Sequence, residues 1–264
     1  MTVSSTRPAS AGRATAPPEP GTTVRLSRMR KVIASRMLES LRVSAQLTAV
    51  QEADVTRIAD LRNRVKERFV AAEGVSLTYQ PFIARAVIDT LKEFPQFNAS
   101  IDAECTSVTY HAGVHLGVAV DTPRGLVVPV VRDADTMTVP VLARTIADLA
   151  ERVRTNKISP DELTGSTFTI SNIGSNGSLT DTPIINQPEV AILGTGAITR
   201  MPRILVDESG VEQIAVRSVC SLPLTYDHRL VDGADAGRLL TALRRRLAEV
   251  EFAGELASYE SDPA

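Results

Sequence analysis

The spacing of apolar residues along the chain predicts amphipathic helices that alternate with short strands. Apolar residues recur at helical intervals in residues 28–43, 57–73, 81–94, 139–154 and 234–250. Gly74 and Pro95 end the second and third of these segments. Short β-rich segments at residues 47–55, 108–110, 114–120, 126–131, 168–171, 190–199 and 213–225 are predicted strands. This mixture predicts one α/β domain with a partly antiparallel sheet.

The two ends of the chain differ in composition from its middle. Residues 1–22 are rich in Ala, Pro, Ser, Thr and Gly and contain almost no large apolar residue. Such a segment buries too little surface to offset its ordering entropy, so we expect a flexible linker. Residues 253–264 are acidic and poor in apolar residues. We therefore expect a domain over residues 23–252, followed by an acidic C-terminal tail.

Charge and composition exclude several classes of function. The net charge of -2 argues against a dedicated nucleic-acid binder. The chain has neither a run of about 18 apolar residues nor a secretory signal, so we expect no membrane span. Basic residues alternate with apolar ones in residues 28–43, which favours a docking helix with a solvated basic face. Cys105 and Cys220 lie far apart without a zinc-binding spacing, which fits a reducing cytosol and no metal site. These features predict a cytoplasmic protein.

One of the three histidines lies in a setting that suits catalysis. His111, His115 and His228 are the candidates for a general base near neutral pH. His228 lies in Leu224-Thr-Tyr-Asp-His-Arg-Leu-Val-Asp-Gly233, between a predicted strand and the last helix, where catalytic side chains concentrate. Taken alone, the motif allows two interpretations. His228 is either a general base for acyl transfer or a histidine held by neighbouring carboxylates for structural reasons.

A second polar cluster closes another predicted strand. Ser171 and Asn172 close the strand predicted within Gly165-Ser-Thr-Phe-Thr-Ile-Ser-Asn-Ile-Gly174, and Thr182-Pro-Ile-Ile-Asn-Gln-Pro188 follows. Exposed hydroxyl and amide donors at such a position can stabilise an oxyanion. The alternative is that they only cap turns, as Ser and Asn often do.

Together these motifs resemble a known family. Phe168-Thr-Ile-Ser-Asn-Ile-Gly, Thr182-Pro-Ile-Ile-Asn and Asp227-His-Arg-Leu-Val-Asp-Gly are similar, in the same order, to the catalytic domain of the dihydrolipoyl acyltransferase component of 2-oxo acid dehydrogenase complexes. The similarity extends over roughly residues 26–247 and includes residues 29–37, 97–100 and 117–130. It implies an α/β (α+β) fold like that of chloramphenicol acetyltransferase, with a central mixed sheet flanked by helices. It also implies a homotrimer with active sites between subunits, the histidine coming from one chain and the serine from its neighbour.

The resemblance also implies a reaction and a set of residues. The family moves an acyl group between the thiols of dihydrolipoamide and coenzyme A, which is a substrate here, without a metal. By this resemblance His228 is the general base, Ser171 stabilises the oxyanion and Asp232 organises the site through an arginine. The coenzyme A contacts would be Arg62, Thr78, Asp121, Ser171, Asn172 and Gly196. For Arg62, the alternative of an ordinary surface arginine stays open.

Three departures from the family pattern shape the remaining expectations. The chain has no lipoyl domain, so the lipoyl group would be carried on a domain not in this chain. Expected partners are that domain, the 2-oxo acid dehydrogenase and the dihydrolipoamide dehydrogenase. The tail offers little apolar surface beyond Phe252 and Leu256, which favours a free trimer over a cage. Residues 44–52 look closer to succinyl-transferring members, although bacterial acetyl-transferring members can share this form.

Several alternatives for the function therefore stay open. The leading hypothesis is transfer of an acetyl group in a pyruvate dehydrogenase-type complex, and the chain most resembles bacterial members of the family. Succinyl and branched-chain transfer remain alternatives. A free-standing acetyltransferase for a small alcohol and a non-catalytic trimeric scaffold are two further alternatives.

Overall fold

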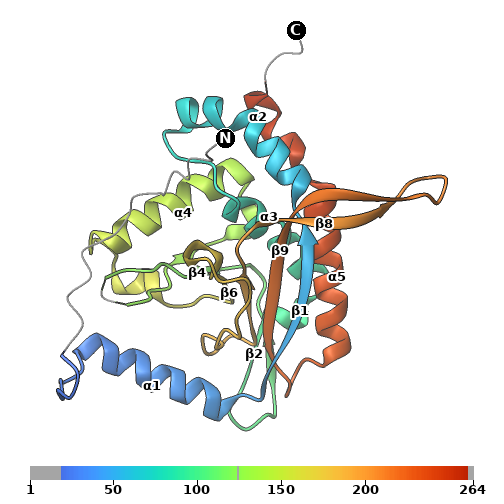
Figure 1. Ribbon diagram of the computed structural model, residues 1–264. Coiled ribbons are helices and arrows are strands. Elements are labelled where there is room, and N and C mark those ends of the chain that lie inside the picture. The colour runs from blue at the N-terminus through green and yellow to red at the C-terminus, as the bar shows by residue number, and fades with distance from the viewer. Residues whose placement is uncertain (1–18, 124, 261–264) are drawn as a thin grey trace.

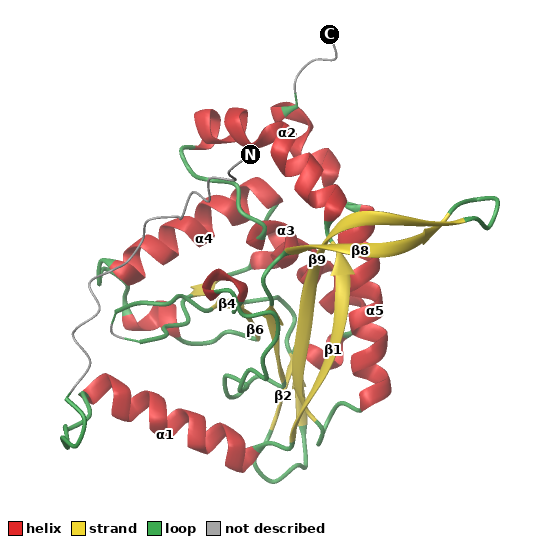
Figure 2. Ribbon diagram, in the orientation of Figure 1, coloured by secondary structure: helices red, strands yellow, loops and turns green. Residues whose placement is uncertain are grey.

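A seven-stranded mixed sheet lies at the centre of the fold, with helices packed around it (Figures 1 and 2). The structure is a computed structural model that describes residues 19–123 and 125–260. The strand order is β1-β9-β7-β6-β4-β5, and β8 pairs with β9. The strands are β1 (Gln46–Asp54), β4 (Leu116–Val118), β5 (Val130–Val131), β6 (Phe168–Asn172), β7 (Ala191–Thr195), β8 (Thr199–Val206) and β9 (Glu212–Asp227). A separate two-stranded sheet joins β2 (Ala99–Ile101) to β3 (Val108–Tyr110).

The sheet is parallel only at its centre. β6 runs parallel to both β4 and β7, whereas β9 is antiparallel to β7, β1 and β8. All five residues of β7 are buried, as expected for a central strand that is covered on both faces. The prediction of a partly antiparallel sheet is therefore confirmed.

Within residues 19–123 and 125–260 the α-helices are α1 (Arg28–Val43), α2 (Thr56–Glu73), α3 (Gln80–Glu93), α4 (Val139–Arg154) and α5 (Gly233–Glu249). α5 packs against β1 and β9, and α3 packs against α4 and α5. The core beneath them contains the fully buried rings of Phe69, Phe82, Phe97 and Phe168. None of the helices in the described ranges has the length and apolar character needed to cross a membrane.

Helix α1 has a different environment from the others. It extends along one side of the molecule in Figure 1, and Ser40 is its buried residue. Its apolar side chains Val32, Leu38 and Leu41 are about half exposed. A helix with an uncovered apolar face fits the predicted docking role.

Most predicted elements are present, and two strands were missed. The predicted bounds of α1, α4 and β3 agree with the structure to the residue. The strand predicted at residues 190–199 is wrong in its second half, because β7 ends at Thr195 and a new strand, β8, begins at Thr199. β8 contains Pro202 and two arginines, which interrupt an apolar pattern and are tolerated on an edge strand. β2, with only three residues, was also missed.

Residues 253–259 pack against α2 and α4. Residues 253–264 were expected to form a tail outside the domain, but a 3-10 helix at Ala253–Tyr259 places Leu256 in the core with no exposed surface. The Tyr259 ring lies 5.0 Å from that of Phe69. The Glu255 carboxylate accepts a 2.6 Å hydrogen bond from the N–H of Val139, at the start of α4.

The predicted linker lies mostly outside the described residues, which begin at Glu19. Within it, Glu19 to Thr22 form an exposed turn, closed by a 3.2 Å hydrogen bond from the Thr22 N–H to the Glu19 carbonyl.

Candidate active site

The predicted general base, His228, follows the last residue of β9. Its side chain is exposed, on a turn that leads into α5. The His228 ring lies 5.9 Å from the ring of Tyr226. An exposed imidazole on a turn is accessible to a substrate, which fits the catalytic interpretation of the motif.

Asp232 begins the helix that follows the histidine. Its carboxylate accepts a 2.8 Å hydrogen bond from the N–H of Asp235 and caps α5. This hydrogen bond, followed by weaker effects that include the charges of Arg238 and His228, lowers the pKa of Asp232. Among the described residues Asp232 makes no ion pair with an arginine, so the structure does not support the expectation that Asp232 acts through an arginine within one chain.

A different carboxylate is paired with an arginine at this turn. Asp227 is almost fully buried, and the Arg229 guanidinium binds both of its oxygens, with the shortest contact at 2.7 Å. On its other side, the Asp227 Oδ1 accepts a 3.2 Å hydrogen bond from the Ala45 N–H. We assigned no role to these residues from the sequence, although Asp227 and Arg229 flank the histidine in the motif.

The predicted oxyanion donor, Ser171, lines a separate cavity of about 680 Å³. This cavity lies beside the end of β6 and also exposes Asp121 and Asn172. Thr169 and residues 181–184 lie on its wall as well. Three of the six predicted coenzyme A contacts therefore share one cavity.

A smaller cavity of about 220 Å³ adjoins the first one. It is lined by Thr78, Asn172 and Gly196, and it shares Gln80, Asn172 and Ser175 with the larger cavity. Gly196 is needed here for close packing, because a Cβ atom at this position would lie 2.0 Å from the Leu179 carbonyl oxygen. The two cavities thus share lining residues, and together they hold five of the six predicted contacts.

Arg62, the sixth predicted contact, lies beside the smaller cavity and does not line it. Its Nε donates a 2.6 Å hydrogen bond to the Leu77 carbonyl. Its guanidinium carbon lies 5.2 Å from the ring centre of Tyr79, which does line the cavity. A cation at this position can approach an anionic group that projects from the cavity.

One chain does not bring Ser171 and His228 together. Ser171 pairs with Gly194 of β7, and Gly194 packs against Pro223 of β9. His228 follows Pro223 by five residues, which corresponds to roughly 16 Å along the strand at about 3.3 Å per residue. The two predicted catalytic groups therefore belong to different parts of the chain's surface.

A buried carboxyl group behind the larger cavity was also missed from the sequence. Glu189 is 2% exposed, and its Oε1 accepts hydrogen bonds from the hydroxyl of Thr169 and the amide of Asn186, each at 2.9 Å. The Ser166 hydroxyl donates to the same oxygen. Burial raises the pKa of Glu189 to about 7. Since Thr169 and Asn186 line the cavity, Glu189 supports its wall.

The described residues contain no group of three or more His, Cys, Asp or Glu side chains that could hold a metal ion. Both cysteines are free thiols, with Cys220 buried and Cys105 exposed. Burial raises the pKa of Cys220 to about 11.

Comparison with curated proteins gives consistent relatives. The chain is 54% identical over 236 residues to the dihydrolipoyllysine-residue acetyltransferase component of the pyruvate dehydrogenase complex from Mycobacterium tuberculosis, covering 89% of this chain and 43% of the relative. The component of the same name from Corynebacterium glutamicum is 49% identical, over 89% of this chain and 35% of that protein. A succinyltransferase component of the 2-oxoglutarate dehydrogenase complex from Cupriavidus necator is 42% identical, over 86% and 53%. The chain thus spans about half or less of the length of these relatives.

Solved structures agree with this comparison. A probable dihydrolipoamide acetyltransferase from Listeria monocytogenes superposes with a TM-score of 0.82 at 35% identity, covering 88% of this chain and 96% of that one. A dihydrolipoamide acetyltransferase from Azotobacter vinelandii superposes with a TM-score of 0.81 at 34% identity, over 90% and 99%. The predicted fold is confirmed by these likenesses. A model of the family described as 2-oxoacid dehydrogenases acyltransferase (catalytic domain) matches residues 18–254, and the chain belongs to this family.

Proposed function

We propose that the protein transfers an acetyl group between the thiol of a dihydrolipoyl group and the thiol of coenzyme A, in a pyruvate dehydrogenase-type complex. The observation that carries this proposal is the pair of adjoining cavities that share Asn172 and together expose Ser171, Thr78, Asp121 and Gly196. Acetyl is preferred because the relatives at 54% and 49% identity are named acetyltransferases, whereas the succinyltransferase relative is 42% identical.

The proposed reaction needs a base and an oxyanion donor. A free alkyl thiol with a pKa of about 8.5 is mostly protonated at pH 7, and the thiolate is the nucleophile. His228 takes the proton from the attacking thiol, whose sulfur forms a bond to the thioester carbonyl carbon. Ser171 donates a hydrogen bond to the resulting oxyanion. When the tetrahedral intermediate collapses, the other sulfur leaves as a thiolate and takes the proton back from His228.

Each site would be formed by two chains of a homotrimer. The distance between Ser171 and His228 along one chain supports this proposal, because the base and the oxyanion donor must meet at a single carbonyl. The Azotobacter vinelandii acetyltransferase was investigated for the catalytic role of a serine, a histidine and an asparagine four residues after the histidine. In this chain, Asp232 has that spacing from His228. In the proposed reaction, Asp232 contributes by capping α5 and so ordering the turn that carries His228.

The lipoyl group would arrive on a domain outside this chain, in an assembly with a 2-oxo acid dehydrogenase and a dihydrolipoamide dehydrogenase. One similar solved structure is the cubic core of a pyruvate dehydrogenase multienzyme complex. A free trimer is favoured here because Phe252 and Leu256 are buried within their own chain. A cytoplasmic location in a bacterium fits the two free thiols and the bacterial relatives.

The test is acyl transfer from acetyl-CoA and, in parallel, from succinyl-CoA to dihydrolipoamide. We expect turnover with acetyl-CoA that falls by about 10²–10⁴ in His228→Ala. His111→Ala is the matched control, since His111 belongs to none of the motifs assigned to the proposed site, and it should keep its activity. A preference for succinyl-CoA would replace acetyl with succinyl in the proposal. Turnover that does not depend on His228 would contradict the mechanism, and a trimer without turnover would favour a scaffold.

A further inference from the structure

The turn that carries His228 must be fixed by contacts with the rest of the chain if the histidine is to act as a base. The histidine side chain is exposed and follows the end of a strand, where backbone motion is usually larger than in the core. A general base must lie within about 3 Å of the atom whose proton it takes. A displacement of about 1 Å can cost about 100-fold in rate. The efficiency of His228 therefore depends on what fixes this turn.

Ala45, the residue before β1, contacts the turn twice. The His228 N–H donates a 2.8 Å hydrogen bond to the Ala45 carbonyl. The Ala45 N–H donates in return to the Asp227 Oδ1 at 3.2 Å. Neither contact involves the side chain of Ala45, so they depend only on where its backbone lies. They fasten the histidine backbone to the neighbouring strand β1.

The second contact has a buried carboxyl group as its acceptor. Asp227 is 1% exposed, and a carboxylate at such a site is stable only when it is paired and hydrogen-bonded. Arg229 provides this pairing through Nε, at 3.0 Å from both oxygens, and through Nη2, at 2.7 Å from Oδ2. The Arg229 backbone N–H adds a 3.1 Å hydrogen bond to Oδ1. One arginine thus neutralises the carboxylate on which Ala45 depends.

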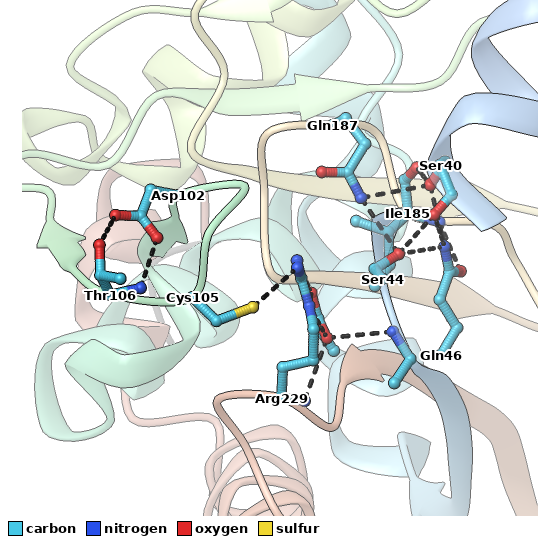
Figure 3. Close-up of polar contacts among 11 residues, drawn as sticks. Ser40, Ser44, Gln46, Asp102, Cys105, Thr106, Ile185, Gln187 and Arg229 are labelled. Carbon is cyan, nitrogen blue, oxygen red and sulfur yellow. Dashed lines mark hydrogen bonds and ion pairs between the residues drawn. The ribbon is translucent and has the colours of Figure 1, made fainter. Parts of the chain in front are cut away.

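The Arg229 side chain also contacts Cys105, on the side away from Asp227. Its Nη1 lies 3.4 Å from the Cys105 sulfur, at the tip of the loop between β2 and β3, and Figure 3 shows Cys105 directed at Arg229. The hydrogen bonds to Asp227 raise the pKa of Arg229, so its charge is fixed. The guanidinium therefore has contacts on both sides and little freedom to move.

We propose that Arg229 is a positioning residue for acyl transfer, because its pairing with Asp227 keeps the Ala45 contacts and so holds the His228 ring in place. The proposal rests on the function proposed above. Arg229 need not touch either substrate, and its effect passes through His228. It follows that the loss of Arg229 should matter only while His228 is present.

The first test is a double-mutant cycle on acetyl transfer. We expect Arg229→Met to lower kcat about 10- to 100-fold, with KM for coenzyme A changed less than about threefold. Arg229→Lys keeps the positive charge but lacks the paired N–H donors of the guanidinium, so it should recover part of the lost kcat. In the His228→Ala background the same Arg229→Met change should lower kcat by less than about twofold. An equal loss in both backgrounds would overturn the proposal.

Arg152→Met is the matched control. Arg152 also forms ion pairs, with Asp148 and Glu162, but it lies on α4, and neither of its partners belongs to the turn that carries His228. We expect its activity to stay within about twofold of the wild type.

The second test does not require activity. Hydrogen exchange of the backbone amides of Ala45 and His228 should become at least about tenfold faster in Arg229→Met, while the amides of β7 stay protected. Unchanged exchange at these two amides would overturn the proposal whatever the kinetics show. If the wild type showed no His228-dependent transfer, the proposed function would fail, and the exchange result would still decide whether Arg229 holds the turn.

Discussion

Ser171 lies on the central sheet and His228 on the turn after β9, about five residues further along the strand direction, because Gly194, the partner of Ser171, packs against Pro223. A base and an oxyanion donor at that separation cannot act on one carbonyl group. Chemistry that needs both residues therefore needs two copies of the chain. This geometry makes the assembly itself testable through its catalytic residues.

Two inactive variants should restore activity to each other. We expect Ser171→Ala to lose about 10²–10³ in kcat and His228→Ala at least as much. When the two variants are unfolded together in equal amounts and refolded, about a quarter of the sites in random trimers regain both residues. The acetyl-transfer assay should recover in that proportion.

The control for this experiment is to mix separately folded trimers, which should stay inactive if subunits do not exchange. Recovery in the co-refolded sample and none in the mixed trimers would support a site between subunits. The absence of recovery in both samples would contradict it.

Arg62 gives a prediction about substrate affinity. Its guanidinium lies beside the smaller cavity, over the ring of Tyr79, where it can pair with a phosphate of coenzyme A. Arg62→Met should raise KM for coenzyme A about tenfold with kcat changed less than about twofold, because the contact is the same in the ground and transition states. Steady-state kinetics with coenzyme A as the varied substrate measure this.

Arg64→Met is the matched control on the same helix. Its side chain is 60% exposed and pairs with Glu260. This variant should leave KM unchanged, since exposed pairs contribute little. If Arg62→Met also left KM unchanged, Arg62 would be a surface arginine that only holds the Leu77 carbonyl.

The motif residues could be predicted from the sequence, but the residues that hold them in place could not. Ser171 and Asn172 were identified because they belong to recognisable local patterns, and Gly196 was implied by the family resemblance; the structure places all three around adjoining cavities. Glu189 and Ala45 act through residues more than 15 positions away in the chain, Thr169 and Asp227 respectively. Contacts of this kind depend on strand register, and no local pattern in one sequence contains that information.

The fold shows the same division. Helices α1 and α4 were predicted to the residue because their apolar spacing alone defines them. β8 was missed because its exposed and half-buried residues alternate on an edge strand, and its pairing with β9 stabilises it more than its own composition does. β8 forms because it pairs with β9, and the propensity of its own residues does not indicate this.

Glu189 should make stability depend on pH. Its pKa rises from an ordinary 4.5 to about 7 in the folded protein. Between these values the folded state keeps the proton that the unfolded state has released, so the free energy of unfolding falls as pH rises. The loss over this window is roughly 3 kcal/mol. Glu189→Gln cannot ionise and should remove this part of the pH dependence.

Denaturant unfolding at pH 5 and pH 8, at one protein concentration, measures the difference. Glu189→Gln keeps the acceptor oxygen, and its amide nitrogen takes the place of Oε2, which has no hydrogen-bond partner among the described residues. Glu208→Gln, an exposed residue in the turn after β8, is the control and should keep the wild-type slope. An unchanged slope in Glu189→Gln would show that Glu189 is ionised throughout.

Leu256 decides whether the C-terminal segment belongs to the domain. Its side chain is fully buried, so Leu256→Ala should lower the free energy of unfolding by about 2–5 kcal/mol through lost contacts and a residual cavity. Val211→Ala, at a side chain that is 54% exposed, should change it by less than about 0.5 kcal/mol. Both are measured by denaturant unfolding, with light scattering to record the size of the assembly. A segment that joins trimers would give the opposite result, since Leu256→Ala would then reduce the size of the assembly and leave the stability of each trimer unchanged.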